Sequence, residues 1–171
     1  MTESKHIQHN TQGRIGQGFD LHRLVPEKRL LLGGVLIESS PRGSDAHSDG
    51  DVLLHALIDA VLGALGQGDI GDHFPPSDAQ WKDADSLLLL QQVLDQILKP
   101  SGYCLVNIDT TVFLETPKLT PYKLGIREKL ASTLQLPLDA VSFKAKTMEG
   151  LGPIGHGEAI AASVTVLLSP V

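Results

Sequence analysis

The chain has 171 residues, of which 42% are hydrophobic, enough apolar material for one domain with a buried core. Its formal net charge is -6 and it has no run of Lys or Arg, which excludes an extended nucleic-acid surface or an anionic membrane face. No apolar segment approaches the ~20 residues that span a bilayer, so we expect a cytoplasmic protein with no membrane or nucleic-acid partner. The polar residues 1–13 predict a disordered N-terminal extension before a single domain over residues 14–171. The single cysteine, Cys104, has apolar neighbours that predict a buried thiol.

The first half of the domain predicts two β segments and one helix. Alternating apolar and polar residues indicate a strand over residues 14–21, and a second β run is expected over residues 29–37. Residues 51–65 carry leucines at spacings of three and four, which is typical of a buried helix. A loop rich in Gly, Pro and Asp follows over residues 66–83. Its length predicts a lid or a binding loop.

The second half predicts two further helices and three strands. A leucine stripe indicates a helix over residues 85–98, and a strand follows over residues 103–114. A Thr-Pro pair opens a helix over residues 120–134, and strands over 141–145 and 158–168 complete the chain. Strands and helices do not alternate regularly. We therefore expect an α+β fold, with a mixed β-sheet and its helices packed on one face.

Three residues have the chemistry of metal ligands. Asp20 and His22 form an Asp-x-His pair on one face of the first strand, and His55 lies in an otherwise apolar helix. Catalytic zinc sites take three such ligands and leave the fourth position to water or substrate. His55 is open to two interpretations: a core histidine satisfied by a neighbouring carboxylate, or a zinc ligand oriented by one. Asp51 and Asp59, one turn away on either side, are the candidates for that carboxylate.

Three other segments have the composition of phosphate or hydroxyl sites. His47 and Ser48 precede the first helix, where they form either an ordinary solvated loop or, with helix-terminal N–H groups, donors to a phosphate. Residues 69–71 form either an acidic turn or a hydroxyl-binding element. Residues 144–150 bring two lysines, a threonine and a glutamate to a strand end, as an exposed terminus or as a site for a nucleotide diphosphate with a divalent cation. Motifs for serine or cysteine nucleophiles are lacking, which leaves metal-assisted phosphate chemistry.

Together these motifs resemble the 2-C-methyl-D-erythritol 2,4-cyclodiphosphate synthase family of the non-mevalonate isoprenoid pathway. The resemblance covers nearly everything after Gly13. The motifs that carry it are Arg14-Ile15-Gly16-x-Gly18-Phe19-Asp20-x-His22, Ala46-His47-Ser48-Asp49-Gly50-Asp51-Val52-x-x-His55, Gly68-Asp69-Ile70-Gly71, Pro117-Lys118, and Thr147-x-Glu149 followed by Gly155-x-Gly157-Glu158.

The resemblance implies an assembly and a set of metal ions. It implies a homotrimer with its sheets toward the three-fold axis and its active sites at subunit interfaces. Each site would join a zinc cluster of one chain to a cytidine pocket formed largely by the next. The implied zinc ligands are Asp20, His22 and His55, with Mn²⁺ or Co²⁺ as substitutes. Glu149 is the implied ligand of a second ion, Mg²⁺ or Mn²⁺, which bridges the substrate diphosphate.

The reaction that the resemblance implies closes a ring. The 2-phosphate of 4-diphosphocytidyl-2-C-methyl-D-erythritol 2-phosphate attacks the β-phosphorus of the same molecule and releases CMP, with His47, Thr147 and Glu149 in catalytic roles. The implied substrate-binding residues are Asp20, His22, His47, Ser48, Asp69, Ile70, Gly71, Phe74, Asp78, Lys118, Ala145, Lys146, Thr147 and Glu149. Two alternatives are a zinc-dependent phosphohydrolase and a non-catalytic trimeric nucleotide-binding module.

Overall fold

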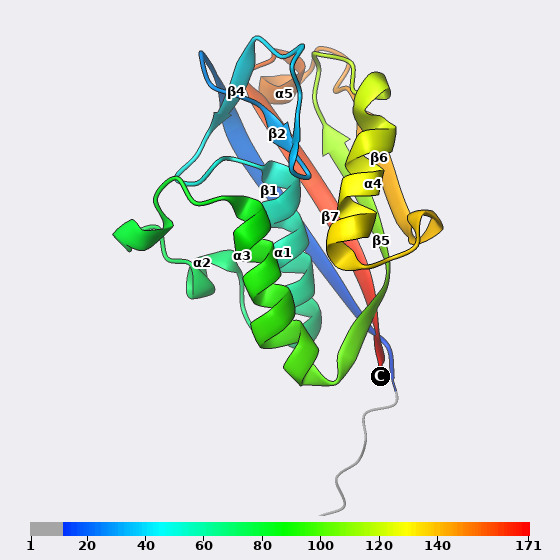
Figure 1. Cartoon of the computed structure of the whole chain (residues 1–171). Coiled ribbons are helices and arrows are strands. Elements are labelled where there is room, and N and C mark those ends of the chain that lie inside the picture. The colour runs from blue at the N-terminus through cyan, green and yellow to red at the C-terminus, as the bar shows by residue number, and fades with distance from the viewer. Residues whose placement is uncertain (1–11) are drawn as a thin grey trace, which may run out of the picture.

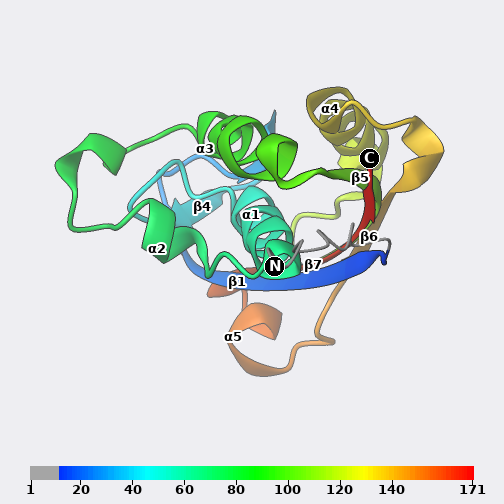
Figure 2. The same cartoon turned by 90° about the horizontal axis from the view of Figure 1, so that it is seen from below.

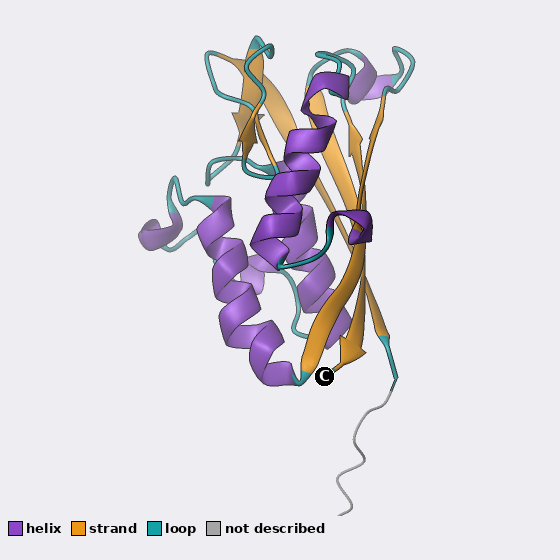
Figure 3. Ribbon diagram, turned by 45° about the vertical axis from the view of Figure 1, so that its right-hand side comes forward, coloured by secondary structure: helices purple, strands orange, loops and turns teal. Residues whose placement is uncertain are grey.

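A computed structural model describes residues 12–171 as one five-stranded sheet with helices packed against it (Figure 1 and Figure 3). The first eleven residues of the predicted N-terminal extension lie outside the described residues. The strand order is β4-β1-β7-β5-β6, and every neighbouring pair is antiparallel except β5 and β6. The strands are β1 (Arg14–Pro26), β4 (Arg42–Asp45), β5 (Tyr103–Phe113), β6 (Val141–Lys146) and β7 (Ala159–Pro170). The predicted mixed sheet is thus confirmed.

The longer helices cover one face of this sheet. They are α1 (Val52–Leu65), α3 (Ser86–Val93), which continues as a π-helical turn over Leu94–Leu98, and α4 (Lys123–Leu134). The shorter helices are α2 (Ile70–His73), α5 (Gly152–Gly155) and 3-10 turns at Ala79–Trp81, Lys99–Ser101, Thr120–Tyr122 and Leu138–Ala140. Figure 2 places the short α5 on the opposite face, so the prediction of helices on one face is confirmed for α1, α3 and α4 but not for α5. Among the helices of residues 12–171, none has the length and hydropathy that a membrane span requires.

The second predicted β run does not join the main sheet. Residues 29–37 form a separate hairpin, in which β2 (Leu31–Leu32) pairs only with β3 (Val35–Leu36). Gly33 and Gly34 turn the chain between them, both with positive φ angles that side-chain-bearing residues rarely adopt. Because the turn reverses the chain after two residues, neither half is long enough to extend the sheet.

Two further features of the sheet differ from the sequence prediction. The edge strand β4 is absent from the prediction because its sequence, Arg-Gly-Ser-Asp, has neither β-branched residues nor apolar alternation. It forms through backbone pairing with the end of β1 at residues 23–26. Cys104 is exposed instead of buried, because strand alternation turns Tyr103 toward the helices and Cys104 toward the uncovered face.

Glycines on β1 allow α1 to pack directly on the strand. Gly16 and Gly18 lie on the face of β1 that is turned toward α1, and both are buried. A Cβ atom added to Gly16 would overlap the backbone oxygen of Ala60, and one added to Gly18 would overlap the backbone oxygen of Ala56. Helix and strand therefore meet backbone to backbone. This close approach brings His55 of α1 next to Asp20 and His22, which follow Gly18 on the same face of β1.

Gly18→Ala should destabilise the protein. The added methyl group has no space against the α1 backbone, so helix and strand must separate, and overpacking of this kind typically costs about 1–3 kcal/mol. Urea unfolding measures the change in the free energy of unfolding. Gly125→Ala is the matched control, because Gly125 lies in α4 with open space around its Cα, and alanine there should be neutral or stabilising. Equal stability of the two variants would contradict the close-packing explanation.

A buried carboxylate fixes the start of α1. Asp51 caps the helix by accepting hydrogen bonds from two backbone N–H groups of its first turn. It also accepts from the backbone N–H groups of Gly33 and Gly34, at 2.9 and 2.7 Å. Burial raises the pKa of Asp51, although these backbone N–H donors oppose the rise. Asp51 thus ties the β2–β3 hairpin to the helix end, one turn before His55.

Candidate active site

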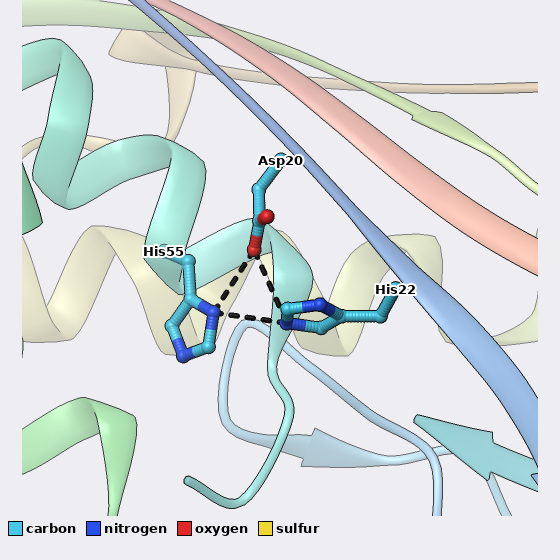
Figure 4. Close-up of side chains that lie close together, drawn as sticks. All are labelled: Asp20, His22 and His55. Atoms are coloured by element: carbon cyan, nitrogen blue, oxygen red, sulfur yellow. Dashed lines mark hydrogen bonds and ion pairs between the residues drawn. The ribbon is translucent and has the colours of Figure 1, made fainter. Parts of the chain in front are cut away.

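The three predicted metal ligands meet between β1 and α1 (Figure 4). Asp20 Oδ2 lies 2.9 Å from His55 Nδ1 and 3.2 Å from His22 Nε2, and the two ring nitrogens are 3.0 Å apart. Strand alternation turns Asp20 and His22 to the same face, and the close packing of α1 brings His55 against them. One carboxylate oxygen and two imidazole nitrogens form a donor set that zinc accepts in catalytic sites, so these residues could hold a metal ion.

The ionisation of these groups is strongly coupled. Burial favours the neutral form of Asp20, but the hydrogen bond with His55 and the charges of both imidazoles outweigh it and lower the pKa of the carboxyl. Burial likewise disfavours a charged His55, yet its contact with Asp20 raises the pKa of that imidazole. For His22, burial prevails over the attraction of Asp20 and the pKa falls. Asp20 and His55 therefore each favour the charged form of the other, and an ion bound at Nδ1 of His55 would take the place of a proton on that atom.

The sequence-based candidates for orienting His55 are wrong. Asp51 uses its oxygens to cap α1 and to hold the hairpin. Asp59 accepts the backbone N–H of Ile70 at 2.8 Å. The Nε2 atom of His55 faces two serine hydroxyls instead, 2.9 Å from Ser48 and 3.0 Å from Ser86. Ser86 begins α3, and no local signal in the sequence connects it to a histidine 31 positions earlier.

A cavity of about 290 Å³ opens beside the three ligands. Five other residues expected to contact substrate line it: His47, Ser48, Ile70, Gly71 and Phe74. Asp69 and Asp78 do not line it, and each caps a short helix through its side chain. Trp81, which no sequence motif had indicated, also lines the cavity and packs edge-on against Phe74 with ring centroids 4.9 Å apart. The loop after α1 thus supplies an aromatic wall over the metal ligands.

A second cavity, of about 160 Å³, gathers the other predicted contacts. Lys118, Ala145, Lys146 and Thr147 line it, together with Lys123, which the sequence analysis did not select. The Thr147 hydroxyl donates a hydrogen bond of 2.8 Å to Glu149, so this carboxylate lies at the edge of the cavity. Three lysines around a small cavity attract phosphate groups, and the carboxylate of Glu149 beside them suits a hard divalent cation. Glu115 also lines the cavity, and its carboxylate accepts the N–H of Met148 at 3.0 Å.

The two cavities lie in different parts of the chain. The first contains Asp20 and His22 of β1, whereas the second lies where β5 and β6 end, and the two share no lining residue. β7 separates β1 from β5 in the sheet (Figure 1). Within the described residues, the metal ligands and the lysine-lined cavity therefore remain apart in a single chain.

Comparison with known proteins identifies the family to which this chain belongs. Residues 13–169 match the model of the YgbB family. The 2-C-methyl-D-erythritol 2,4-cyclodiphosphate synthase of Xanthomonas axonopodis pv. citri is 55% identical over 91% of this chain and 92% of its own length. The bifunctional IspDF of Campylobacter jejuni is similar in structure (TM-score 0.88, 42% identity), where 94% of this chain corresponds to 43% of that longer one. A 2C-methyl-D-erythritol-2,4-cyclodiphosphate synthase in its CDP-bound form has a TM-score of 0.84 and 38% identity, over 91% of this chain and all of that one. The chain belongs to the YgbB family.

Proposed function

We propose that the chain is a 2-C-methyl-D-erythritol 2,4-cyclodiphosphate synthase, a phosphorus–oxygen lyase of isoprenoid precursor synthesis. It would convert 4-diphosphocytidyl-2-C-methyl-D-erythritol 2-phosphate to the cyclic diphosphate and CMP. The observation that carries the proposal is the convergence of Asp20, His22 and His55 at the edge of a cavity, in a chain that is 55% identical to a synthase of that name. Folding one phosphate onto another is mainly a problem of charge and positioning, which suits metal ions and lysines.

The proposed ion at Asp20, His22 and His55 is zinc, with Mn²⁺ or Co²⁺ as substitutes. The donor set supports this choice, because two imidazoles and one carboxylate suit zinc better than magnesium, which prefers oxygen ligands. A zinc ion held here would polarise a phosphate oxygen. Glu149 is the proposed ligand of a second ion, Mg²⁺ or Mn²⁺, at the substrate diphosphate. Its support is the position of Glu149 beside the lysine-lined cavity.

The chain's own groups would bind and orient the substrate at both cavities. His47 and Ser48, at the cavity beside the metal ligands, are proposed to hold its phosphates, with His47 in a catalytic role. Asp69, Ile70 and Gly71 would hold the methylerythritol part, and Phe74 to Asp78 would cover it. Lys118, Ala145, Lys146 and Thr147 would bind the cytidine diphosphate, with Thr147 and Glu149 acting on its phosphates. The CDP-bound form of the similar synthase supports a cytidine nucleotide as the ligand.

The proposed assembly is a homotrimer with its sheets toward the three-fold axis. One face of the sheet carries exposed apolar side chains on β1, with Ile15 73%, Phe19 55% and Leu21 49% exposed. An apolar patch of this kind is typical of an interface. In the proposed trimer, the lysine-lined cavity of one subunit would lie beside the metal ligands of its neighbour. This arrangement would complete a site whose two halves lie apart within one chain.

Product analysis tests the proposal. The protein is incubated with the cytidyl substrate, zinc and magnesium, and the products are followed by phosphorus NMR. The expected products are CMP and a cyclic diphosphate, both lost after treatment with a chelator. Opened monophosphates would instead indicate a zinc-dependent phosphohydrolase. Binding of CDP without any product would indicate the non-catalytic trimeric module.

A further inference from the structure

The two ring nitrogens of His55 have different surroundings: one faces the proposed metal site, and the other faces hydroxyl groups of the protein. Nδ1 faces Asp20 and His22, whereas Nε2 faces away from them (Figure 4). An imidazole that binds a metal ion through Nδ1 carries its proton on Nε2. That proton needs an acceptor in a position where His55 is only 8% exposed.

Two hydroxyl groups lie within reach of Nε2, and their surroundings differ. Ser86 is fully buried, and its hydroxyl donates a short hydrogen bond to Asp49 Oδ1. The backbone N–H of Ser86 donates to the other oxygen of the same carboxylate, at 3.0 Å. Asp49 therefore holds both donors of Ser86, and the lone pairs of the hydroxyl remain for His55 at 3.0 Å. Ser48 is only half-buried, and its oxygen also accepts the N–H of Gly50.

The backbone strengthens the contact between Asp49 and the start of α3. The N–H of Asp49 donates to the carbonyl of Ala84 at 3.1 Å, and the N–H of Asp83 donates to the carbonyl of His47 at 2.8 Å. The segment before α1 is thus joined to Asp83 and Ala84, just before α3. Ser86 has little freedom to move away from His55.

We propose that Ser86 and Asp49 are positioning residues, which keep the proton of His55 on Nε2 so that Nδ1 is free to bind the metal ion. This inference rests on the proposed metal role of His55. Two hydrogen bonds form this relay: Nε2–H donates to the Ser86 hydroxyl, and the Ser86 hydroxyl donates to the Asp49 carboxylate. Without the relay, the contact with Asp20 favours a proton on Nδ1, where it blocks the ligand position.

Ser86→Ala tests the relay, with Ser44→Ala as the matched control. Ser44 is also a buried serine, and its hydroxyl has no hydrogen-bond partner among the described residues. Zinc affinity is measured by competition with a chromophoric chelator. Ser86→Ala should bind zinc roughly 10-fold to 100-fold more weakly than the wild type, in the range found for lost hydrogen-bond partners of metal-bound histidines, whereas Ser44→Ala should match the wild type.

A spectroscopic readout separates positioning from a general loss of structure. In the zinc-loaded wild type, proton–nitrogen NMR should detect a slowly exchanging Nε2–H on His55. This signal should exchange faster in Ser86→Ala and in Asp49→Asn, whose amide cannot accept both hydrogen bonds from Ser86. Ser86→Thr, which retains the hydroxyl, should restore much of the zinc affinity lost in Ser86→Ala.

The outcomes distinguish this inference from the proposed function. If the wild type binds zinc, and Ser86→Ala binds it equally well with an unchanged Nε2–H signal, the relay is overturned and the metal site stands. If the wild type binds no zinc, the metal assignment fails and the role of Ser86 fails with it. If Ser86→Ala and Ser44→Ala lose affinity equally, the effect belongs to the core and not to the relay.

Discussion

His55→Ala is expected to lose bound zinc and nearly all synthase activity. The substitution removes one of three protein ligands, and the remaining Asp20 and His22 cannot retain a catalytic ion at ordinary concentrations. A metal ion contributes several kcal/mol of charge stabilisation, so turnover should fall on the order of 1,000-fold. Atomic absorption measures the zinc content of the purified protein, and CMP release measures turnover.

His156→Ala is the control for this variant. His156 follows α5, which lies on the other face of the sheet from the three ligands, so its removal should leave the zinc content unchanged (Figure 2). Circular dichroism checks that His55→Ala retains its helices. A folded His55→Ala protein with full zinc content and normal CMP release would rule out the proposed metal site.

Two inactive variants should restore activity to each other when their chains assemble together. His55→Ala damages the metal half of the site and retains the lysine-lined cavity, whereas Glu149→Gln does the reverse. In mixed trimers, a site with two intact halves forms wherever an intact metal half faces an intact nucleotide half. Random assembly of equal amounts gives about a quarter of the wild-type sites. Co-expression followed by measurement of CMP release tests this expectation.

The control is a mixture of the two purified variants under conditions in which subunits do not exchange. This mixture should remain inactive, because every trimer then contains only one kind of damaged site. If the co-expressed proteins are equally inactive, the complete site lies within one chain and the proposed interface is wrong. Light scattering on the same samples reports whether the chains form trimers.

Local patterns in the sequence identified Asp20, His22 and His55 as candidate metal ligands, left two interpretations of His55 open, and did not predict the surroundings of these residues. Strand alternation placed Asp20 and His22 on one face, and helical spacing placed His55 on an apolar helix. Nε2 of His55 faces Ser48 and Ser86, and Ser86 is held by Asp49, which lies 37 positions before it. No periodicity connects residues so distant, because their contact depends on how the loop between them folds back.

The backbone explains the other differences between prediction and structure. β4 pairs through main-chain groups that every residue carries, so its composition gave no signal. The run over residues 29–37 has the composition of a strand, but two adjacent glycines with positive φ angles turn it into a hairpin. The separation of the lysine-lined cavity from the metal ligands follows from strand order. Strand order is a property of the whole sheet and cannot be read from any one segment.

The contact of Gly16 and Gly18 with α1 also affects the entropy that the chain would lose when a metal ion binds. The strand and the helix that carry the three candidate ligands pack backbone to backbone, and the ligand atoms already lie within 4.8 Å of one another. An ion that binds there meets ligand atoms that are already gathered, so we expect little loss of chain entropy to oppose its binding.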